Sequence, residues 1–190
     1  QKFLKKKYNV KFNKNFSDIH KWSVKNSELF WNSIWDHSKV LGEKRNKCKF
    51  NKQIFKSKFL VNSKLNFAEN LLQKKDNSKA ITFISENGFK ENISWKDLYN
   101  SSSKIVNFLI KKKIKKNDRI AAYMPNTIDT VTFFIATSSI GAIWSSCSPD
   151  FGTEGLIERF SQIKPKILIL TDRYFYNGKK INILKRLPKI

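Results

Sequence analysis

Cysteine and histidine are scarce in this 190-residue chain, which contains two of each. Cys48 and Cys147 lie far apart and form no CxxC pair, and neither His20 nor His37 has a second ligand at metal-binding spacing. The sequence therefore predicts neither a zinc site nor a disulfide framework. Cys147 lies in an apolar stretch, so we expect it to be a small buried side chain rather than a nucleophile.

Glycine is also sparse, and the six glycines never form GxGxxG or GxxxxGK[ST]. The chain therefore lacks the usual glycine-rich phosphate loops. A cluster of three serines, Ser145, Ser146 and Ser148, has no G-x-S-x-G elbow around it, so we do not expect a serine nucleophile. We assign no catalytic residue and no metal ligand within this sequence.

Long hydrophobic runs are missing as well. The most apolar window, residues 131–144, is interrupted by Thr and Ser and falls short of the ~20 residues that a membrane span needs. The basic start is not followed by an apolar run of signal-peptide length. We therefore expect a cytoplasmic protein with no membrane partner.

Acidic residues are few: 15 Asp and Glu stand against 38 Lys and Arg, which gives a net charge of +23. Such an excess would suit nucleic acid, because cations neutralise phosphates and release counterions. Arginine, the residue that grips phosphates and bases bidentately, occurs at only five positions, and the lysines are spread in short runs. We favour a solvated surface over specific nucleic-acid binding, with a stand-alone basic anion-binding module as the alternative.

Aromatic residues are abundant, and 16 Phe and 5 Trp within a hydrophobic fraction of 40% are enough for a core. Residues 1–78 are predicted to form a helical and irregular region, with one helix capped by Asn26 or Ser27. The chain begins with Gln1 rather than Met and ends at Ile190 within a helix-like segment that starts near Ile181. We therefore expect a piece of a longer polypeptide.

The regular part begins near Lys79. Strand-like runs at 80–85 and 89–93 flank Asn87-Gly88, the dipeptide that suits a type I′ hairpin turn. Ser94 is followed three residues later by Asp97, which predicts a helix start. The apolar face of that helix is expected to carry Leu98, Ile105, Val106, Leu109 and Ile110.

Three apolar strands follow, at residues 119–124, 142–146 and 167–170. Helices are predicted between them, over 129–140 and from Thr153, which we expect to cap the second helix. Buried strands that alternate with helices indicate a β-α-β-α-β unit with a parallel sheet. Residues 79–190 are therefore predicted to be an α/β domain.

One polar loop follows the third strand and reads Tyr176-Asn177-Gly178-Lys179-Lys180. Open α/β sheets place ligands at the carboxyl ends of their strands. The loop offers a turn, backbone amides and two ammonium groups, which suit a phosphate-bearing ligand. The alternative is an ordinary surface turn beside lysines.

Several segments together are similar to one enzyme family. They are Lys64 to Leu72 (KLNFAENLL), Asn117 to Thr127 (NDRIAAYMPNT), Gly141 to Gly152 (GAIWSSCSPDFG) and Tyr176 to Lys180 (YNGKK). In these four segments the chain resembles the acetoacetate–CoA ligases, a branch of the adenylate-forming acyl-CoA synthetases. The resemblance implies an amino-terminal fragment: a helical lead-in followed by β-α-β-α-β layers of an incomplete adenylate-forming large domain.

The resemblance also implies a reaction. The family uses ATP and Mg²⁺ to convert acetoacetate to an acyl-adenylate, and CoA then attacks to give acetoacetyl-CoA. The phosphate loop and catalytic lysine of the family lie beyond Ile190, so the fragment alone is expected to be inactive and to need the rest of the same polypeptide. Acetate or propionate is the alternative substrate.

The resemblance finally implies a role for the polar loop. In related acetyl-CoA synthetases the matching loop contacts the phosphorylated nucleotide end of CoA, which implies cofactor-binding roles for Asn177, Gly178, Lys179 and Lys180. Those enzymes carry arginine at both ends of the loop, where this chain has Tyr176 and Lys179.

Overall fold

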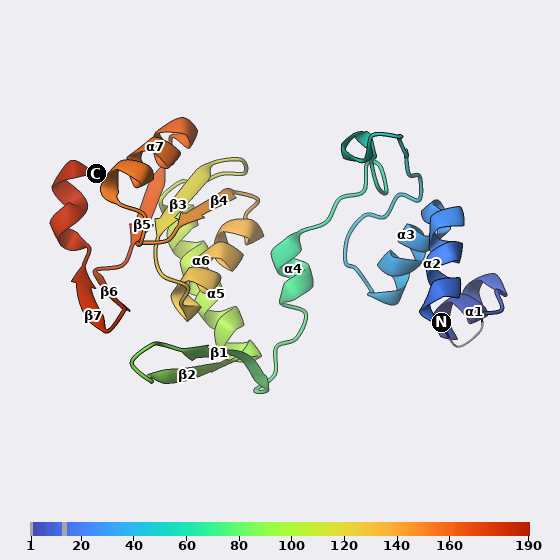
Figure 1. Ribbon diagram of the computed structural model, residues 1–190, viewed down its shortest axis with the longest axis horizontal. Coiled ribbons are helices and arrows are strands. Elements are labelled where there is room, and N and C mark those ends of the chain that lie inside the picture. The colour runs from blue at the N-terminus through green and yellow to red at the C-terminus, as the bar shows by residue number, and fades with distance from the viewer. Residues whose placement is uncertain (1, 13–14) are drawn as a thin grey trace. The chain divides into compact units, whose positions relative to one another are not determined.

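The computed structural model of the protein describes residues 2–12 and 15–190 (Figure 1). Its contacts divide the chain into two compact units, Gln1–Asn66 and Phe67–Ile190. The division falls before residue 78, where the sequence suggested a boundary, because helix α4 (Phe67–Leu71) belongs to the second unit. Ala68 of this helix clusters with Leu98 and Ile135 of the second unit.

The first unit contains α-helices, a short 3-10 helix and two extended segments. Its helices are α1 (Lys2–Tyr8), α2 (Phe16–Lys25), α3 (Ser27–His37) and η1 (Ile54–Lys56). The expected side-chain cap of α3 is absent: the Asn26 amide donates to the Trp22 carbonyl and the Ser27 hydroxyl donates to the Val24 carbonyl. Both side chains are used by the end of α2, because only Asn26 separates the two helices.

The second unit opens with an antiparallel hairpin of β1 (Lys79–Ile84) and β2 (Lys90–Ser94). The prediction of a type I′ turn at Asn87-Gly88 is wrong. Such a turn needs a positive φ at both central residues, and only Gly88 has one, 80°. The Gly88 amide donates to the Ser85 carbonyl at 3.0 Å, so residues 85–88 form the turn, and Gly88, its last residue, is in the left-handed region. This arrangement matches a longer loop that ends in a glycine bulge.

Helix α5 (Trp95–Lys111) begins as the sequence predicted. The Ser94 hydroxyl accepts from the Asp97 amide at 3.1 Å and donates to the Asp97 carboxylate. Leu98 and Leu109 are buried, but the expectation for Ile110 is wrong, because 57% of it is exposed. Ile110 lies one residue beyond Leu109, and a step of about 100° per residue turns it out of the buried stripe.

The central sheet is parallel, as predicted, and its strands are β3 (Arg119–Tyr123), β4 (Ile143–Cys147) and β5 (Ile167–Leu170). Their order is β4-β3-β5, with β3 in the middle, paired over its whole length with β4 and from Ile120 to Tyr123 with β5. The connecting helices are α6 (Ile128–Ser139) and α7 (Thr153–Ile163). These elements confirm the α/β fold class.

The two faces of this sheet bury different helices. Ile120 of β3 clusters with Leu109 of α5 and Ala136 of α6. The next residue of the strand, Ala121, clusters with Leu156 and the rest of the buried face of α7. Successive strand residues face opposite sides, so α5 and α6 cover one face and α7 covers the other.

Three local features after β4 differ from expectation. Thr153 does not cap α7: it is the first helical residue, and Gly152 occupies the cap position without a side-chain hydrogen bond. After β5 the chain forms a second antiparallel hairpin, β6 (Arg173–Tyr176) and β7 (Lys179–Asn182), and then the 3-10 helix η2 (Leu184–Lys189). The helix-like segment expected from Ile181 is therefore partly strand.

None of the helices in the described ranges is long and apolar enough to cross a membrane.

Candidate ligand-binding site

The carboxyl edge of the parallel sheet is organised around Tyr123, the last residue of β3. Its side chain is fully buried, and its hydroxyl lies 2.9 Å from the carbonyl oxygen of Pro149 and 2.7 Å from that of Phe151. Arg186 of η2 donates through Nη1 to the Tyr123 hydroxyl and, at 2.9 Å, to the Pro149 carbonyl. The turn after β4 is thereby fixed to the middle strand and to η2.

A second contact fixes the β6–β7 hairpin to the same turn. The Tyr174 hydroxyl donates to Asp150 Oδ1 at 3.0 Å, and the Ser148 hydroxyl donates to Asp150 Oδ2 at 2.8 Å. Burial, together with the bond to Asp150, raises the pKa of Tyr174 to about 12, because both favour the neutral phenol. Tyr174 is only 7% exposed, so this hydroxyl is an internal anchor rather than a surface group.

Cys147 ends β4 next to this turn and is buried, as the sequence predicted. Burial raises the pKa of its thiol, since the thiolate would lose its solvation. A raised pKa disfavours the nucleophilic form, which agrees with a packing role.

The predicted ligand loop is the turn of the β6–β7 hairpin. Asn177 and Gly178 both have positive φ, 49° and 70°. Tyr176 pairs directly with Lys179, so the loop contains two residues and has the signs of a type I′ turn. All four residues predicted for the site, Asn177, Gly178, Lys179 and Lys180, are exposed.

The structure separates the two lysines of this loop. Successive strand residues face opposite sides, so Lys179 lies on the face of Tyr174, while Lys180 lies on the face of Arg173. A cavity of about 280 Å³ opens on the Lys180 face and is lined by Asp172, Arg173, Lys180, Asn182 and Leu184. Lys179 is not among its lining residues.

Arg173 is the residue that sequence reasoning missed. Its Nε donates to Asp172 Oδ2 at 2.7 Å, and this contact lowers the pKa of the Asp172 carboxyl. A guanidinium beside an ammonium group, with a backbone turn next to them, suits an anion of phosphate type. Arg173 could be placed on the face of Lys180 only once its segment was known to be a strand paired with β7.

Metal ligation has no comparable basis in the part of the chain that the structure describes. Among residues 2–12 and 15–190, no group of three or more His, Cys, Asp or Glu side chains could hold a metal ion. The candidate site therefore consists of cations, amides and an anchored turn.

Open α/β sheets bind their ligands at the carboxyl ends of their strands, where this chain carries the anchored turn and the basic hairpin. Residues 67–189 match the family described as AMP-binding enzyme, and the chain belongs to this family.

Two individual relatives of the chain carry the name acetoacetyl-CoA synthetase or its long form. The chain is 40% identical over 177 residues to acetoacetyl-coenzyme A synthetase of Rhizobium meliloti (strain 1021), which covers 91% of this chain. It is 35% identical over 185 residues to acetoacetyl-CoA synthetase of Gallus gallus, which covers 93% of this chain. The chain spans 27% of the length of each of these relatives.

A solved structure shows the same fold. The acetoacetyl-CoA synthetase from Streptomyces lividans superposes with a TM-score of 0.90 and 23% sequence identity. The match covers all of this chain and 30% of that one.

Proposed function

We propose that this chain forms part of an ATP-dependent acid–thiol ligase that makes acetoacetyl-CoA from acetoacetate, ATP and CoA through an acyl-adenylate. The observation that carries the proposal is 40% identity across 91% of the chain to a protein named acetoacetyl-coenzyme A synthetase. Membership of the AMP-binding enzymes supports the adenylate step. The proposal includes a reducing compartment such as the cytoplasm, and the buried, free thiols Cys48 and Cys147 agree with it.

The β6–β7 hairpin is proposed to bind the phosphorylated nucleotide end of CoA. Arg173 and Lys180 would attract the phosphates from one face of the hairpin. Asn177 and Gly178 would offer backbone at the turn, and Lys179 would add charge from the other face. The anchor between Tyr174 and Asp150 holds this hairpin on the sheet edge, which reduces the ordering that binding requires.

Mg²⁺ is part of the proposed reaction, since it offsets the charge of the phosphates during adenylate formation. The described residues offer no cluster of ligands for it. We therefore assign this chain no metal-dependent step, and its own proposed contribution is to bind and orient CoA.

The activity is tested on the longest protein that contains this sequence. We expect exchange of pyrophosphate into ATP that depends on acetoacetate, with acetate and propionate at least about tenfold less effective, equivalent to 1.4 kcal/mol of discrimination. Exchange that prefers acetate or propionate would contradict the substrate assignment. The 190-residue chain alone should give none, and exchange by it would contradict the view that the catalytic groups lie elsewhere.

The CoA contact is tested separately by titrating the 190-residue chain with adenosine 3′,5′-bisphosphate. The double variant Arg173→Gln/Lys180→Gln should weaken binding about tenfold or more, because it removes the two cations of one face. The matched control Lys185→Gln/Lys189→Gln removes two exposed charges from η2 and should change binding less than about twofold. If the double variant and the control weakened binding equally, the effect would be one of general charge, and the proposed contact of Arg173 and Lys180 with the phosphates would be contradicted.

A further inference from the structure

A second basic cavity lies in the first unit, and none of its lining residues belongs to the β6–β7 hairpin. It is formed by two antiparallel segments, residues 43–49 and 58–64, which are joined at both ends. Glu43 and Lys64 exchange backbone hydrogen bonds at 2.8 and 3.0 Å, and Lys49 and Lys58 do so at 2.8 and 2.7 Å. The Val61 amide donates to the Lys47 carbonyl at 2.7 Å between them. These bonds give the cavity a defined backbone frame.

The first of these segments is also held to helix α3. Lys44 Nζ donates to Asp36 Oδ1 at 2.6 Å, and the Cys48 amide donates to Glu28 Oε2 at 2.8 Å. Asn32 Nδ2 donates to the Asn46 carbonyl at 2.7 Å. The segment is thus bonded to α3 through the Lys44 side chain and through the backbone of Asn46 and Cys48.

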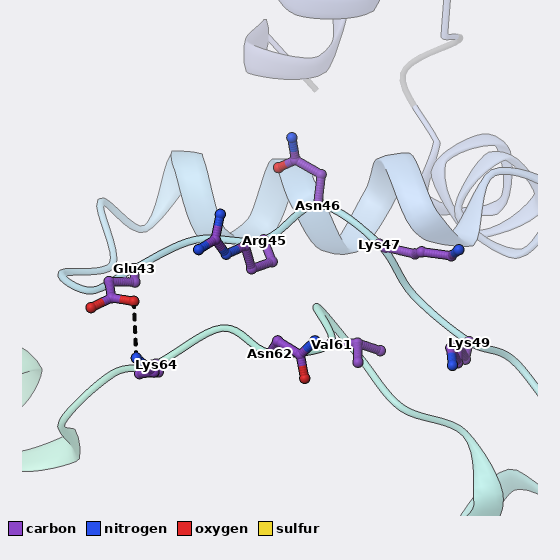
Figure 2. A pocket seen from close by; sticks show the side chains of 8 residues that line it. All are labelled: Glu43, Arg45, Asn46, Lys47, Lys49, Val61, Asn62 and Lys64. Atoms are coloured by element: carbon purple, nitrogen blue, oxygen red, sulfur yellow. Dashed lines mark ion pairs between the residues drawn. The ribbon is translucent and has the colours of Figure 1, made fainter.

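The residues at positions 45, 47 and 49 of this segment are basic. Arg45, Lys47 and Lys49 line a cavity of about 760 Å³, together with Glu43, Asn46, Val61, Asn62 and Lys64. Figure 2 shows the Glu43–Lys64 ion pair at one end of this cavity and Lys49 at the other. Four of the eight lining residues are cations and one is a carboxylate, which leaves a net charge of three.

The single carboxylate of the cavity is already engaged. Glu43 Oε2 lies 3.3 Å from Lys64 Nζ, and no other carboxylate lines the cavity. Within the described part of the chain, no acidic group forms an ion pair with Arg45, Lys47 or Lys49. Three cations in one framed hollow repel one another, and an anion between them would relieve that repulsion.

We propose that this cavity is a binding site for a linear oligophosphate, such as the phosphate chain of a nucleotide or free tripolyphosphate. Alternate residues of an extended segment are about 6.6 Å apart, so Arg45, Lys47 and Lys49 present a row of cations rather than one point. A chain of phosphates can contact such a row at several places, whereas a single phosphate cannot. The cavity volume is in the usual range for small-molecule sites, about 300–1,000 Å³.

The test uses tripolyphosphate as the probe and the 190-residue chain as the protein. Calorimetry at 0.15 M ionic strength limits diffuse attraction to the charged surface, because the Debye length there is about 8 Å. We expect the chain to bind tripolyphosphate at least about tenfold more tightly than inorganic phosphate. The triple variant Arg45→Gln/Lys47→Gln/Lys49→Gln should lose at least about tenfold of that affinity.

The matched control is Lys111→Gln/Lys112→Gln/Lys113→Gln, which removes the same charge from exposed residues at the end of α5. It should change the affinity less than about twofold. Equal losses in both variants, or no binding by the unmodified chain, would overturn the proposal. So would tighter binding of a short single-stranded oligonucleotide through the same residues, since that would make the site a nucleic-acid interface.

Hydrogen exchange on the unmodified chain gives a readout that does not depend on the variants. Tripolyphosphate should slow exchange of backbone amides in residues 43–49 and 58–64 more than in the β6–β7 hairpin. Protection confined to the hairpin would overturn the assignment of this cavity. Because the first unit contains none of the residues proposed to bind CoA, failure here and failure of the CoA site are separate results.

Discussion

Replacing Tyr174 with Phe tests whether the hairpin is anchored to the sheet edge by a buried, neutral phenol. The substitution removes the hydrogen bond to Asp150 Oδ1 and leaves the ring in place. A hydrogen bond to a charged group contributes about 1.5 kcal/mol, so the variant should be less stable by that amount at pH 8. Asp150 is exposed and keeps its contact with Ser148, so water can replace the lost partner at moderate cost.

The same anchor makes stability depend on alkaline pH. The folded-state pKa of Tyr174, raised to about 12 from 10.0, favours the folded state fully below pH 10. As the pH rises from 10 to 12 the unfolded chain loses its proton first, and stability falls. At pH 11 the loss is about 1.4 kcal/mol relative to pH 8.

The expected result is therefore a gap in stability between the Phe variant and the unmodified protein that changes with pH. The free energy of unfolding, measured by urea denaturation with circular dichroism, should separate the two proteins by about 1.5 kcal/mol at pH 8 and by almost nothing at pH 11. The comparison cancels the titration of the lysines, which both proteins share. Tyr176→Phe is the matched control on the same strand, and should change stability by less than about 0.5 kcal/mol at pH 8. An unchanged gap at pH 11 would refute the anchor.

Three further substitutions test other parts of the second unit. Gly178→Ala should destabilise by about 1 kcal/mol in thermal or urea unfolding, because φ is 70° there, whereas Gly155→Ala inside α7 should not destabilise, and equal effects would contradict the turn assignment. Leu109→Ala should cost about 2–5 kcal/mol of unfolding free energy and Ile110→Ala less than about 1, since only the first is buried; a reversed order would contradict the helix face. Ser94→Ala should lower the unfolding free energy by about 1 kcal/mol through loss of the helix cap, and no change would argue against the capping contact.

The features that sequence reasoning predicted correctly are those settled by neighbouring residues. The start of α5 depends on Ser94 and Asp97, which are three positions apart and bond to each other in the structure. The parallel strands are continuous apolar runs, and burial on both faces requires such runs. Tyr123, the last residue of one of these runs, is fully buried.

The two Asn-Gly pairs show why turns are harder to predict. In the β6–β7 hairpin, Tyr176 pairs with Lys179, which leaves two residues for the turn. In the β1–β2 hairpin, Ile84 pairs with Lys90, which leaves five, and the glycine closes a longer loop. The same dipeptide therefore adopts different conformations because strand register, set by side chains on both strands, decides the loop length.

The prediction of the candidate site was limited by the same lack of information about strand register. Lys179 and Lys180 are adjacent in sequence, which suggested a shared ligand, but a strand turns adjacent side chains to opposite faces. That Lys180 and Arg173 share one face of the hairpin could not be seen without β6 and β7, whose four-residue strands carry too weak a period to recognise.

Hydrogen bonds join the β6–β7 hairpin and η2 to the turn after β4. Tyr174 ties the hairpin to Asp150, and Arg186 ties η2 to Pro149 and to the buried hydroxyl of Tyr123. An anion held by Arg173 and Lys180 would therefore act on a segment that is hydrogen-bonded to the turn between β4 and α7. Ligand binding that stabilises the hairpin should also slow hydrogen exchange in that turn, because the two segments are hydrogen-bonded to each other.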